Sequence, residues 1–156
     1  MTSPSQPEIA VVGFGYIGSV IAAVLAERGF SVVGIDTNAK MIAEVQAGRC
    51  PIPEPGLDAL VGKGVAAGRL TASTDPAAVR GTRAVLITVG TPLSEDYSAD
   101  LAHIRPACAG VAPYLSDGQI VMIKSTVPPG TTRAMHDEII APALPAGARV
   151  NMAFSP

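Results

Sequence analysis

The sequence is poor in several residue types, and each shortage excludes a class of function. Charged residues make up 15% of the 156 residues, aromatic residues 4%, and the formal net charge is −2. The chain therefore lacks the basic surface and stacking rings of nucleic-acid-binding proteins, and no nucleic-acid partner is expected. Two cysteines are too few for a disulfide framework. No zinc-ligand spacing occurs, so no metal site is expected either.

Long apolar runs and targeting signals are also missing. No apolar stretch reaches the roughly eighteen residues that a membrane helix needs, so no membrane contact is expected. The first residues lack the basic start and apolar core of a secretory signal. We therefore expect a cytoplasmic protein, with a disordered tail at residues 1–8 and one folded domain over residues 9–156.

Hydrophobic residues, by contrast, make up 48% of the chain, and they follow an alternating pattern. Apolar runs of strand length alternate with helix-length segments, which predicts an α/β fold whose parallel sheet is covered on both faces. The expected strands span residues 9–12, 31–36, 70–73, 84–89, 119–123 and 149–154. The expected helices span residues 16–28, 39–47, 57–67, 101–114 and 131–141, with a short one ending at Val79.

Six strands with helical crossovers predict a Rossmann-like doubly wound sheet of order 3-2-1-4-5-6. Such a sheet binds its ligand at the carboxyl ends of the strands, where the order reverses. The helix over 16–28 is apolar nearly all round, so we expect it to be mostly buried.

The first turn of this pattern is the glycine loop Gly13-Phe14-Gly15-Tyr16-Ile17-Gly18. It follows a strand and opens a helix, as a dinucleotide-binding G-x-G-x-x-G loop does. Gly13 would permit the tight turn, Gly15 the approach of a pyrophosphate, and Gly18 close packing of helix on strand. The helix N-terminus would then offer free N–H groups to the phosphates. The alternative interpretation is a glycine turn that merely precedes a buried helix.

Asp36 follows Gly18 by eighteen residues, at the end of the second expected strand. This spacing is close to the roughly twenty residues typical of the acid that binds the adenosine ribose. Its carboxylate would accept the ribose hydroxyls and repel a 2′-phosphate, which favours NAD over NADP. The alternative role for Asp36 is to cap the following helix, with Asn38 as the rival cap.

Two further strand ends carry small and hydroxyl-bearing residues. The fourth expected strand ends in 89–92, Val-Gly-Thr-Pro, and the fifth in 124–131, Lys-Ser-Thr-Val-Pro-Pro-Gly-Thr. They suit a close approach by a ligand, although ordinary strand-exit turns have the same composition. His103 and His136 are expected at the surface, and Cys50 and Cys108 in the packing, because no catalytic partner is evident.

Taken together, five segments resemble the UDP-glucose/GDP-mannose dehydrogenase family, the nucleotide-sugar 6-dehydrogenases. These segments are residues 12–18, 34–36, 53–57 (Pro-Glu-Pro-Gly-Leu), 89–93 and 124–131, in family order. Residues 91–93 and 118–133 are closer to the UDP-N-acetyl-sugar branch, such as UDP-N-acetylmannosamine dehydrogenase. Lys124 and residues 89–90 are closer to the UDP-glucose branch, so the sugar stays open.

The resemblance implies an NAD-dependent oxidation of a sugar CH2OH to a carboxylate in two steps, with two NAD molecules. It also implies that the chain is the NAD-binding domain of an enzyme that works as a homo-oligomer. The implied cofactor-binding residues are Gly13, Gly15, Tyr16, Ile17, Gly18, Asp36, Thr91 and Thr126. Thr126 is also implied to position catalytic water, since a threonine hydroxyl is too weak a base to do more at neutral pH.

Full-length members of the family continue with a central helix and a second domain. Those parts supply the catalytic cysteine, a lysine and most of the UDP-sugar site, and neither Cys50 nor Cys108 has the family's catalytic-cysteine context. We therefore expect this chain to be incomplete and inactive alone. The alternatives are a free-standing module that holds NAD without chemistry and, less well supported by the threonine turns, a hydroxyacid dehydrogenase.

Overall fold

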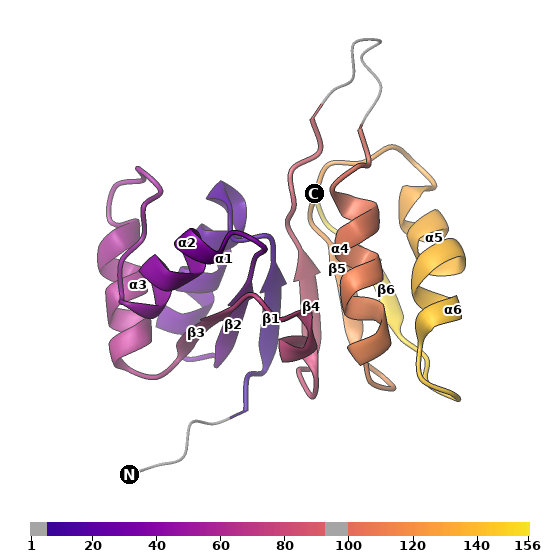
Figure 1. Ribbon diagram of the computed structural model, residues 1–156, viewed down its shortest axis with the longest axis horizontal. Helices are drawn as coiled ribbons and strands as arrows, with labels where there is room; N and C mark the ends of the chain where they lie inside the picture. The colour runs from indigo at the N-terminus through magenta and orange to yellow at the C-terminus, as the bar shows by residue number, and fades with distance from the viewer. Residues whose placement is uncertain (1–5, 93–99) are drawn as a thin grey trace.

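The computed structural model describes residues 6–92 and 100–156 and contains one six-stranded parallel sheet. The strand order is β3-β2-β1-β4-β5-β6, which confirms the predicted 3-2-1-4-5-6 order (Figure 1). The strands are β1 (Ile9–Val12), β2 (Val32–Ile35), β3 (Leu70–Ser73), β4 (Ala84–Ile87), β5 (Ile120–Ile123) and β6 (Asn151–Phe154). All five pairings are parallel and in the same register, so all six carboxyl ends lie along one edge of the sheet.

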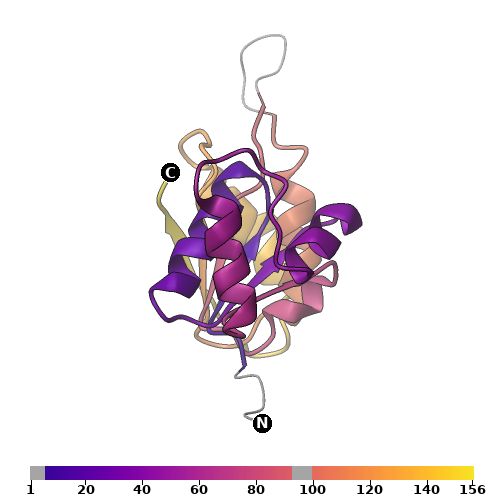
Figure 2. The ribbon, with the colours of Figure 1, turned by 90° about the vertical axis from the view of Figure 1, so that its left-hand side faces the viewer.

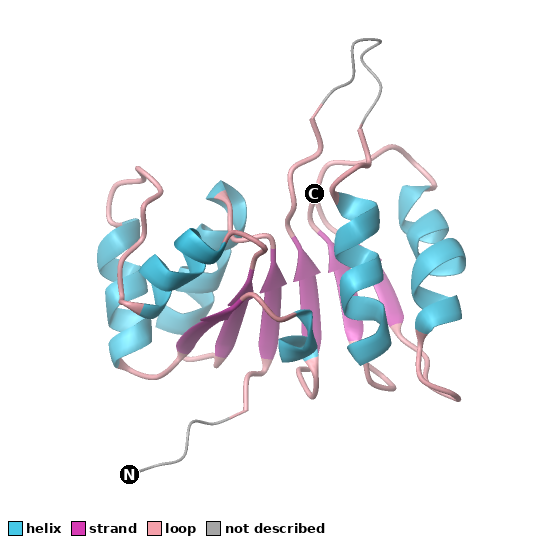
Figure 3. Ribbon diagram, viewed as in Figure 1, coloured by secondary structure: helices cyan, strands magenta, loops and turns pink. Residues whose placement is uncertain are grey.

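The helical segments connect these strands, as Figure 3 shows. They are α1 (Tyr16–Glu27), α2 (Ala39–Gln46), α3 (Leu57–Ala66), η1 (Pro76–Val79), α4 (Ile104–Val111), η2 (Ala112–Tyr114), α5 (Thr131–Met135), η3 (His136–Ile140) and α6 (Ala141–Ala143). Among the described residues, no helix is long and apolar enough to cross a membrane.

The helices α1, α2 and α3 each end one residue before the expected position, and two later helices differ more from their expected bounds. The helix expected from residue 101 begins at Ile104, because the Asp100 carboxylate accepts the Ala102 N–H at 2.8 Å and holds a turn there. Pro106 accordingly lies in the first turn of α4, where its missing N–H is tolerated. The helix expected over 131–141 is interrupted by the π-helical turn η3, which precedes Pro142. A wider turn there is consistent with a proline that cannot donate to the helical ladder.

The helices that pack on β1–β3 cover one face of the sheet, and those that pack on β4–β6 cover the other face. From β1 to β3 the chain adds strands in one direction, and from β4 to β6 in the other. Right-handed crossovers therefore place their helices on opposite sides. Val11, Ala22 and Leu70 belong to the core beneath α1 and α3, and Val85, Ile104 and Val121 to the core beneath α4. Figure 2, seen from the β3 side, shows helices on both sides of the sheet.

This arrangement corrects two expectations about burial. The helix α1 buries only the small residues of one face: Gly18, Ser19, Ala22, Ala23 and Ala26. Its side chains Tyr16, Ile17 and Val24 are 52%, 55% and 40% exposed, so the helix is not mostly buried. The sheet is likewise not fully covered, since on the side of β5 away from α4 Ile120 is 42% exposed.

The N-terminal boundary differs in part from the expected tail. Residues 1–5 lie outside the described residues, as does Leu93 of the fourth-strand motif. Glu8, however, is held at the start of the sheet. Its N–H donates to the Ser31 carbonyl at 2.7 Å, and its carbonyl accepts the Arg83 N–H at 2.7 Å.

Candidate functional site

The glycine loop joins β1 to α1 at the carboxyl edge of the sheet. Gly13 has φ +94°, a left-handed conformation that favours glycine. A Cβ there would also lie 2.9 Å from the Val89 backbone nitrogen, so two reasons exclude a side chain. The Gly13 N–H donates to the Ile35 carbonyl at 2.8 Å, which anchors the loop to β2.

The other two glycines of the loop face different surroundings. A Cβ on Gly18 would lie 1.9 Å from the Gly13 carbonyl oxygen and 2.6 Å from the Thr88 hydroxyl oxygen, so Gly18 is required by packing. A Cβ on Gly15 would meet no atom within 4 Å apart from those of its chain neighbours. The space next to Gly15, at the N-terminus of α1, is therefore open to a ligand, as a pyrophosphate-binding turn requires.

Asp36 lies directly after β2 and turns its carboxylate back toward the glycine loop. Its two oxygens accept the Phe14 N–H at 2.7 Å and the Asn38 N–H at 2.9 Å. The helix cap is Asn38, whose side-chain oxygen accepts the Met41 N–H at 3.2 Å. The alternative capping role therefore belongs to Asn38, and Asp36 is held by two backbone donors that fix the direction of its carboxylate.

Three hydroxyl groups connect the ends of neighbouring strands. Thr88, after β4, reaches the Gly13 carbonyl oxygen at 2.7 Å. Ser125, after β5, donates to the Val89 carbonyl at 2.6 Å. Thr91 donates to the Thr126 carbonyl at 2.9 Å. These hydrogen bonds hold together the segments that follow β1, β4 and β5, so the position of each turn depends on its neighbours.

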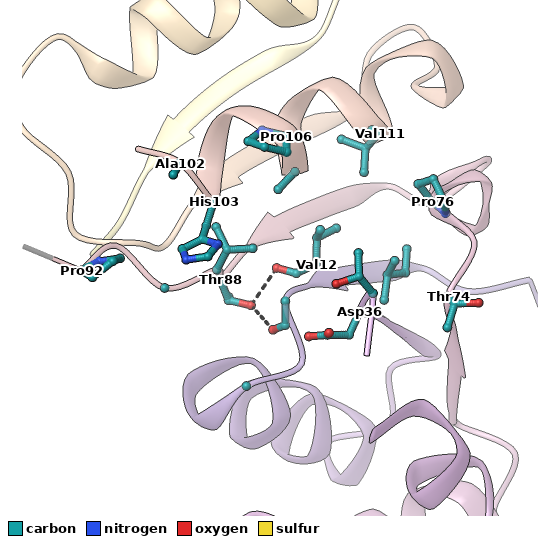
Figure 4. Close-up of a pocket in the computed structure, with 18 residues that line it drawn as sticks. Val12, Asp36, Thr74, Pro76, Thr88, Pro92, Ala102, His103, Pro106 and Val111 are labelled. Atoms are coloured by element: carbon teal, nitrogen blue, oxygen red, sulfur yellow. Dashed lines mark hydrogen bonds between the residues drawn. The ribbon is translucent and has the colours of Figure 1, made fainter. Parts of the chain in front are cut away.

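A cavity of about 490 Å³ opens between the glycine loop and α4 (Figure 4). The residues of the loop side include Gly13, Gly15 and Asp36, and the opposite wall comes from α4. That wall is apolar and small in profile: Pro106, Ala107, Gly110 and Val111. An apolar slot with one fixed carboxylate at its edge suits a base and its attached ribose. Sequence reasoning predicted this helix but not its place in the site, because a periodic pattern does not show which face of a helix lines a cavity.

A second cavity, of about 360 Å³, adjoins the first through Gly15, Thr88, Val89 and Gly90. Besides Gly15 it brings together four more predicted site residues, Tyr16, Ile17, Thr91 and Thr126, although Thr91 lies 75 positions after Tyr16. Lys124, which was not assigned to the site, also lines this cavity, and its Nζ donates to the Ser155 hydroxyl at 3.2 Å. The carboxyl edge therefore carries two adjoining cavities that meet at the glycine loop.

Tyr16 is tied to the proline-rich segment that precedes α3. Its hydroxyl donates to the Glu54 carboxylate. This hydrogen bond, together with desolvation and the charge of Glu54, raises the pKa of Tyr16 above the ordinary 10.0. The contact joins Glu54 to Tyr16, which itself lines the second cavity, and the sequence motifs alone had not connected these two segments.

This contact makes a testable prediction about pH. Glu54→Gln should lower the pKa of Tyr16 toward its ordinary value, because the charged acceptor that disfavours tyrosinate is gone. The measurement is an ultraviolet titration of tyrosinate, with Tyr16→Phe subtracted to isolate this group. Since the folded-state pKa is raised, the contact should stabilise the fold below the ordinary pKa and be lost as the pH rises through the folded value. An unchanged titration in Glu54→Gln would contradict the contact.

The remaining candidates have mainly structural surroundings. His103 is exposed as expected, although it lies at the rim of the larger cavity, and His136 is hydrogen-bonded to Asp137. Cys50 and Cys108 are both buried and free, and burial raises the pKa of the Cys108 thiol to about 11. A thiol with that pKa is protonated at neutral pH, which disfavours a nucleophilic role. Within the described residues, no group of three potential ligands could hold a metal ion.

Comparison with known proteins decides which dinucleotide-binding family this site represents. The family model for the UDP-glucose/GDP-mannose dehydrogenase family, NAD binding domain, matches residues 7–156. The chain belongs to this family. It matches the NAD-binding domain of that family, and the resemblance seen in the five sequence segments is confirmed.

Individual members of the family agree with this assignment. The NDP-N-acetyl-D-galactosaminuronic acid dehydrogenase of Ralstonia nicotianae is 41% identical over 133 residues, which cover 85% of this chain and 31% of that protein. A ternary complex of GDP-mannose dehydrogenase from Pseudomonas aeruginosa superposes with a TM-score of 0.89 at 34% identity, over 96% of this chain and 36% of that one. The UDP-glucose dehydrogenase of Pyrobaculum islandicum has the same TM-score at 35% identity, over 100% and 37% of the two chains.

Two conclusions follow from these family members. The chain spans about a third of the length of the relatives it matches. Members named for three different nucleotide sugars resemble it to a similar degree, so the resemblance of this domain does not select the sugar. What the domain shares with all of them is the part that holds NAD.

Proposed function

We propose that this domain holds NAD for the oxidation of a nucleotide-sugar CH2OH group to a carboxylate. The observation that carries the proposal is the pairing of Asp36 with Gly15 in one cavity. A carboxylate fixed by two N–H groups faces a loop position where no atom apart from those of the chain neighbours lies within 4 Å of a Cβ. A dinucleotide needs both features, an acceptor for its ribose hydroxyls and room for its pyrophosphate.

The residues of the larger cavity would hold the adenosine and pyrophosphate portions of NAD. The Asp36 carboxylate would accept ribose hydroxyls and exclude a 2′-phosphate by charge repulsion, so NAD is preferred over NADP. Gly13 and Gly18 shape the turn, and Gly15 leaves the α1 N-terminus accessible to phosphate oxygens. The wall of α4 would pack on the adenine, because its side chains are apolar or absent.

The second cavity would hold the nicotinamide end, and the bound cofactor would supply a hydride acceptor there. Tyr16 and Ile17 would line the approach, and Thr91 keeps the Thr126 backbone in place through its hydroxyl. Among the described residues, none hydrogen-bonds the Thr126 hydroxyl, so we assign that group to positioning water next to the reacting carbon. A hydroxyl can orient water without changing its own protonation state.

The remaining parts of the proposal concern the whole enzyme. The substrate is a nucleotide sugar, with a UDP-sugar as the expected class, bound mainly by the part of the enzyme that the relatives have in addition. That part would also supply the catalytic cysteine and lysine and, with the domain, form the homo-oligomer. A cytoplasmic location belongs to the same proposal, supported by two cysteines that are both free.

Calorimetric titration of the chain with NAD and with NADP tests this proposal. We expect binding of one NAD per chain, with NADP weaker by about tenfold or more because its 2′-phosphate meets the Asp36 carboxylate. Mixing the chain with NAD and UDP-glucose, GDP-mannose or UDP-N-acetylmannosamine should give no NADH. A folded sample that does not bind NAD would overturn the cofactor assignment. NADH formation would instead show that the chain has a complete active site.

A further inference from the structure

Thr88 is the first residue after β4, and its side chain is directed into the glycine loop. The side chain is buried, with the residue 8% exposed. The hydroxyl oxygen lies 2.7 Å from the Gly13 carbonyl oxygen and 3.0 Å from that of Val12. Figure 4 shows both contacts. A hydroxyl has one hydrogen to donate, so the shorter contact, to Gly13, is the better placed hydrogen bond.

The peptide group between Gly13 and Phe14 connects Thr88 to Asp36. Among the described residues no peptide bond is cis, so the carbonyl and the N–H of this planar group point in opposite directions. The carbonyl oxygen accepts from Thr88, and the N–H at the other end donates to Asp36 Oδ2 at 2.7 Å. One rigid group is thereby held at both ends.

We propose that Thr88 is a positioning residue for the Asp36 carboxylate, acting through the Gly13–Phe14 peptide. The proposal rests on the proposed function, in which Asp36 accepts the ribose hydroxyls. Without the Thr88 hydroxyl, the peptide can rotate about the flexible Gly13, and Phe14 no longer presents its N–H to one carboxylate oxygen. The carboxylate then loses one of the two donors that set its direction, and the ribose loses a fixed acceptor.

Double-mutant cycles on NAD affinity test this coupling. The proteins are the wild type, Thr88→Val, Thr88→Ser, Asp36→Ala and the Thr88→Val/Asp36→Ala double variant. Thr88→Val should weaken NAD binding about fivefold to tenfold, the usual effect of one lost hydrogen bond. Thr88→Ser keeps the hydroxyl and should stay within about twofold of the wild type. In the Asp36→Ala background, Thr88→Val should have an effect below about twofold, because the carboxylate that it positions is gone.

Thr82→Val is the matched control, because Thr82 lies two residues before the start of β4, at the opposite edge of the sheet. Thr82 is also a buried threonine, 3% exposed, whose hydroxyl donates to a backbone carbonyl, that of Val79 at 2.9 Å. Its hydroxyl oxygen also accepts the Gln119 side-chain N–H at 3.0 Å, so Thr82→Val removes at least as many contacts as Thr88→Val. Removal of this hydroxyl in Thr82→Val should lower the melting temperature without changing the affinity for NAD. Thr88→Ala takes the place of Thr88→Val if the latter does not fold.

The outcomes separate this proposal from the one it rests on. If Asp36→Ala binds NAD as the wild type does, the proposed role of Asp36 fails, and that of Thr88 fails with it. If Asp36→Ala weakens binding but the Thr88 effect is the same in both backgrounds, Thr88 acts independently of Asp36 and the coupling is wrong. Equal losses in Thr82→Val and Thr88→Val would assign both to general destabilisation and would also overturn it.

Discussion

Asp36→Ala should weaken NAD binding by about 50-fold, because the ribose loses the equivalent of one charged hydrogen bond, worth roughly 1.5–3 kcal/mol. The carboxylate is already oriented by the N–H groups of Phe14 and Asn38 before any ligand binds. Little ordering is therefore needed on binding, and most of the interaction should count toward affinity. The loss should be measured by calorimetry at a temperature well below the melting transition.

The control for this variant is Asp117→Ala. Asp117 is another carboxylate that accepts one backbone N–H, from Arg149 at 2.8 Å, and it lies at the opposite edge of the sheet. Asp117→Ala should leave the affinity for NAD unchanged. The variant Asp36→Ala should in addition bind NADP nearly as well as NAD, since the charge that repels the 2′-phosphate is gone. A retained preference for NAD would show that another group performs the discrimination.

The second large effect separates two glycines of one loop. Gly18→Ala should lower the free energy of unfolding by about 3 kcal/mol and the melting temperature by about 10 °C. The added methyl group would lie 1.9 Å from the Gly13 carbonyl oxygen, and both the loop and α1 belong to the core-facing part of the fold. Neither can move away without loss of packing.

Gly15→Ala should have the opposite pattern. Its φ of −75° is ordinary for alanine, and the added methyl would meet no atom within 4 Å apart from those of its chain neighbours. Stability should change by less than about 0.5 kcal/mol. NAD affinity should fall by about tenfold or more, because the methyl would enter the space where the two cavities join. Thermal melting with and without NAD measures both effects. A destabilised Gly15→Ala, or a Gly18→Ala of unchanged stability, would contradict the assignment of the two glycines.

Much of this fold was predictable because its signals are local. Alternating strand- and helix-length segments predicted all six strands, and the doubly wound pattern of nucleotide-binding sheets predicted their order. The bounds were less accurate where a single hydrogen bond decides them. The turn held by Asp100 delays α4, for example, and no periodic pattern shows such a contact.

Burial was harder to predict than the elements themselves. The segment that forms α1 is apolar on all sides, which suggested a helix enclosed on all sides. In the structure one face of α1 packs on the sheet, whereas Ile17 and Val24 are exposed. Apolar composition states what a helix is able to bury. Which faces are covered depends on where the crossovers place the other helices.

The sequence by itself determined the parts of the site that short segments encode. The glycine loop, the acid at the end of β2 and the threonine turns each lie within a few residues of a strand end. Because parallel strands end on one edge, their meeting was also predictable. The family follows from the same segments and is confirmed by the match over residues 7–156.

Only the tertiary structure decided which of these groups touch one another. The hydrogen bond from Thr88 to Gly13 joins residues 75 positions apart, and Tyr16 meets Glu54 from 38 positions away. The choice of Asn38 over Asp36 as the helix cap likewise depended on the position of the Phe14 N–H. Hydrogen bonds act over about 3 Å, so such pairings exist only once the sheet has brought the strand ends together.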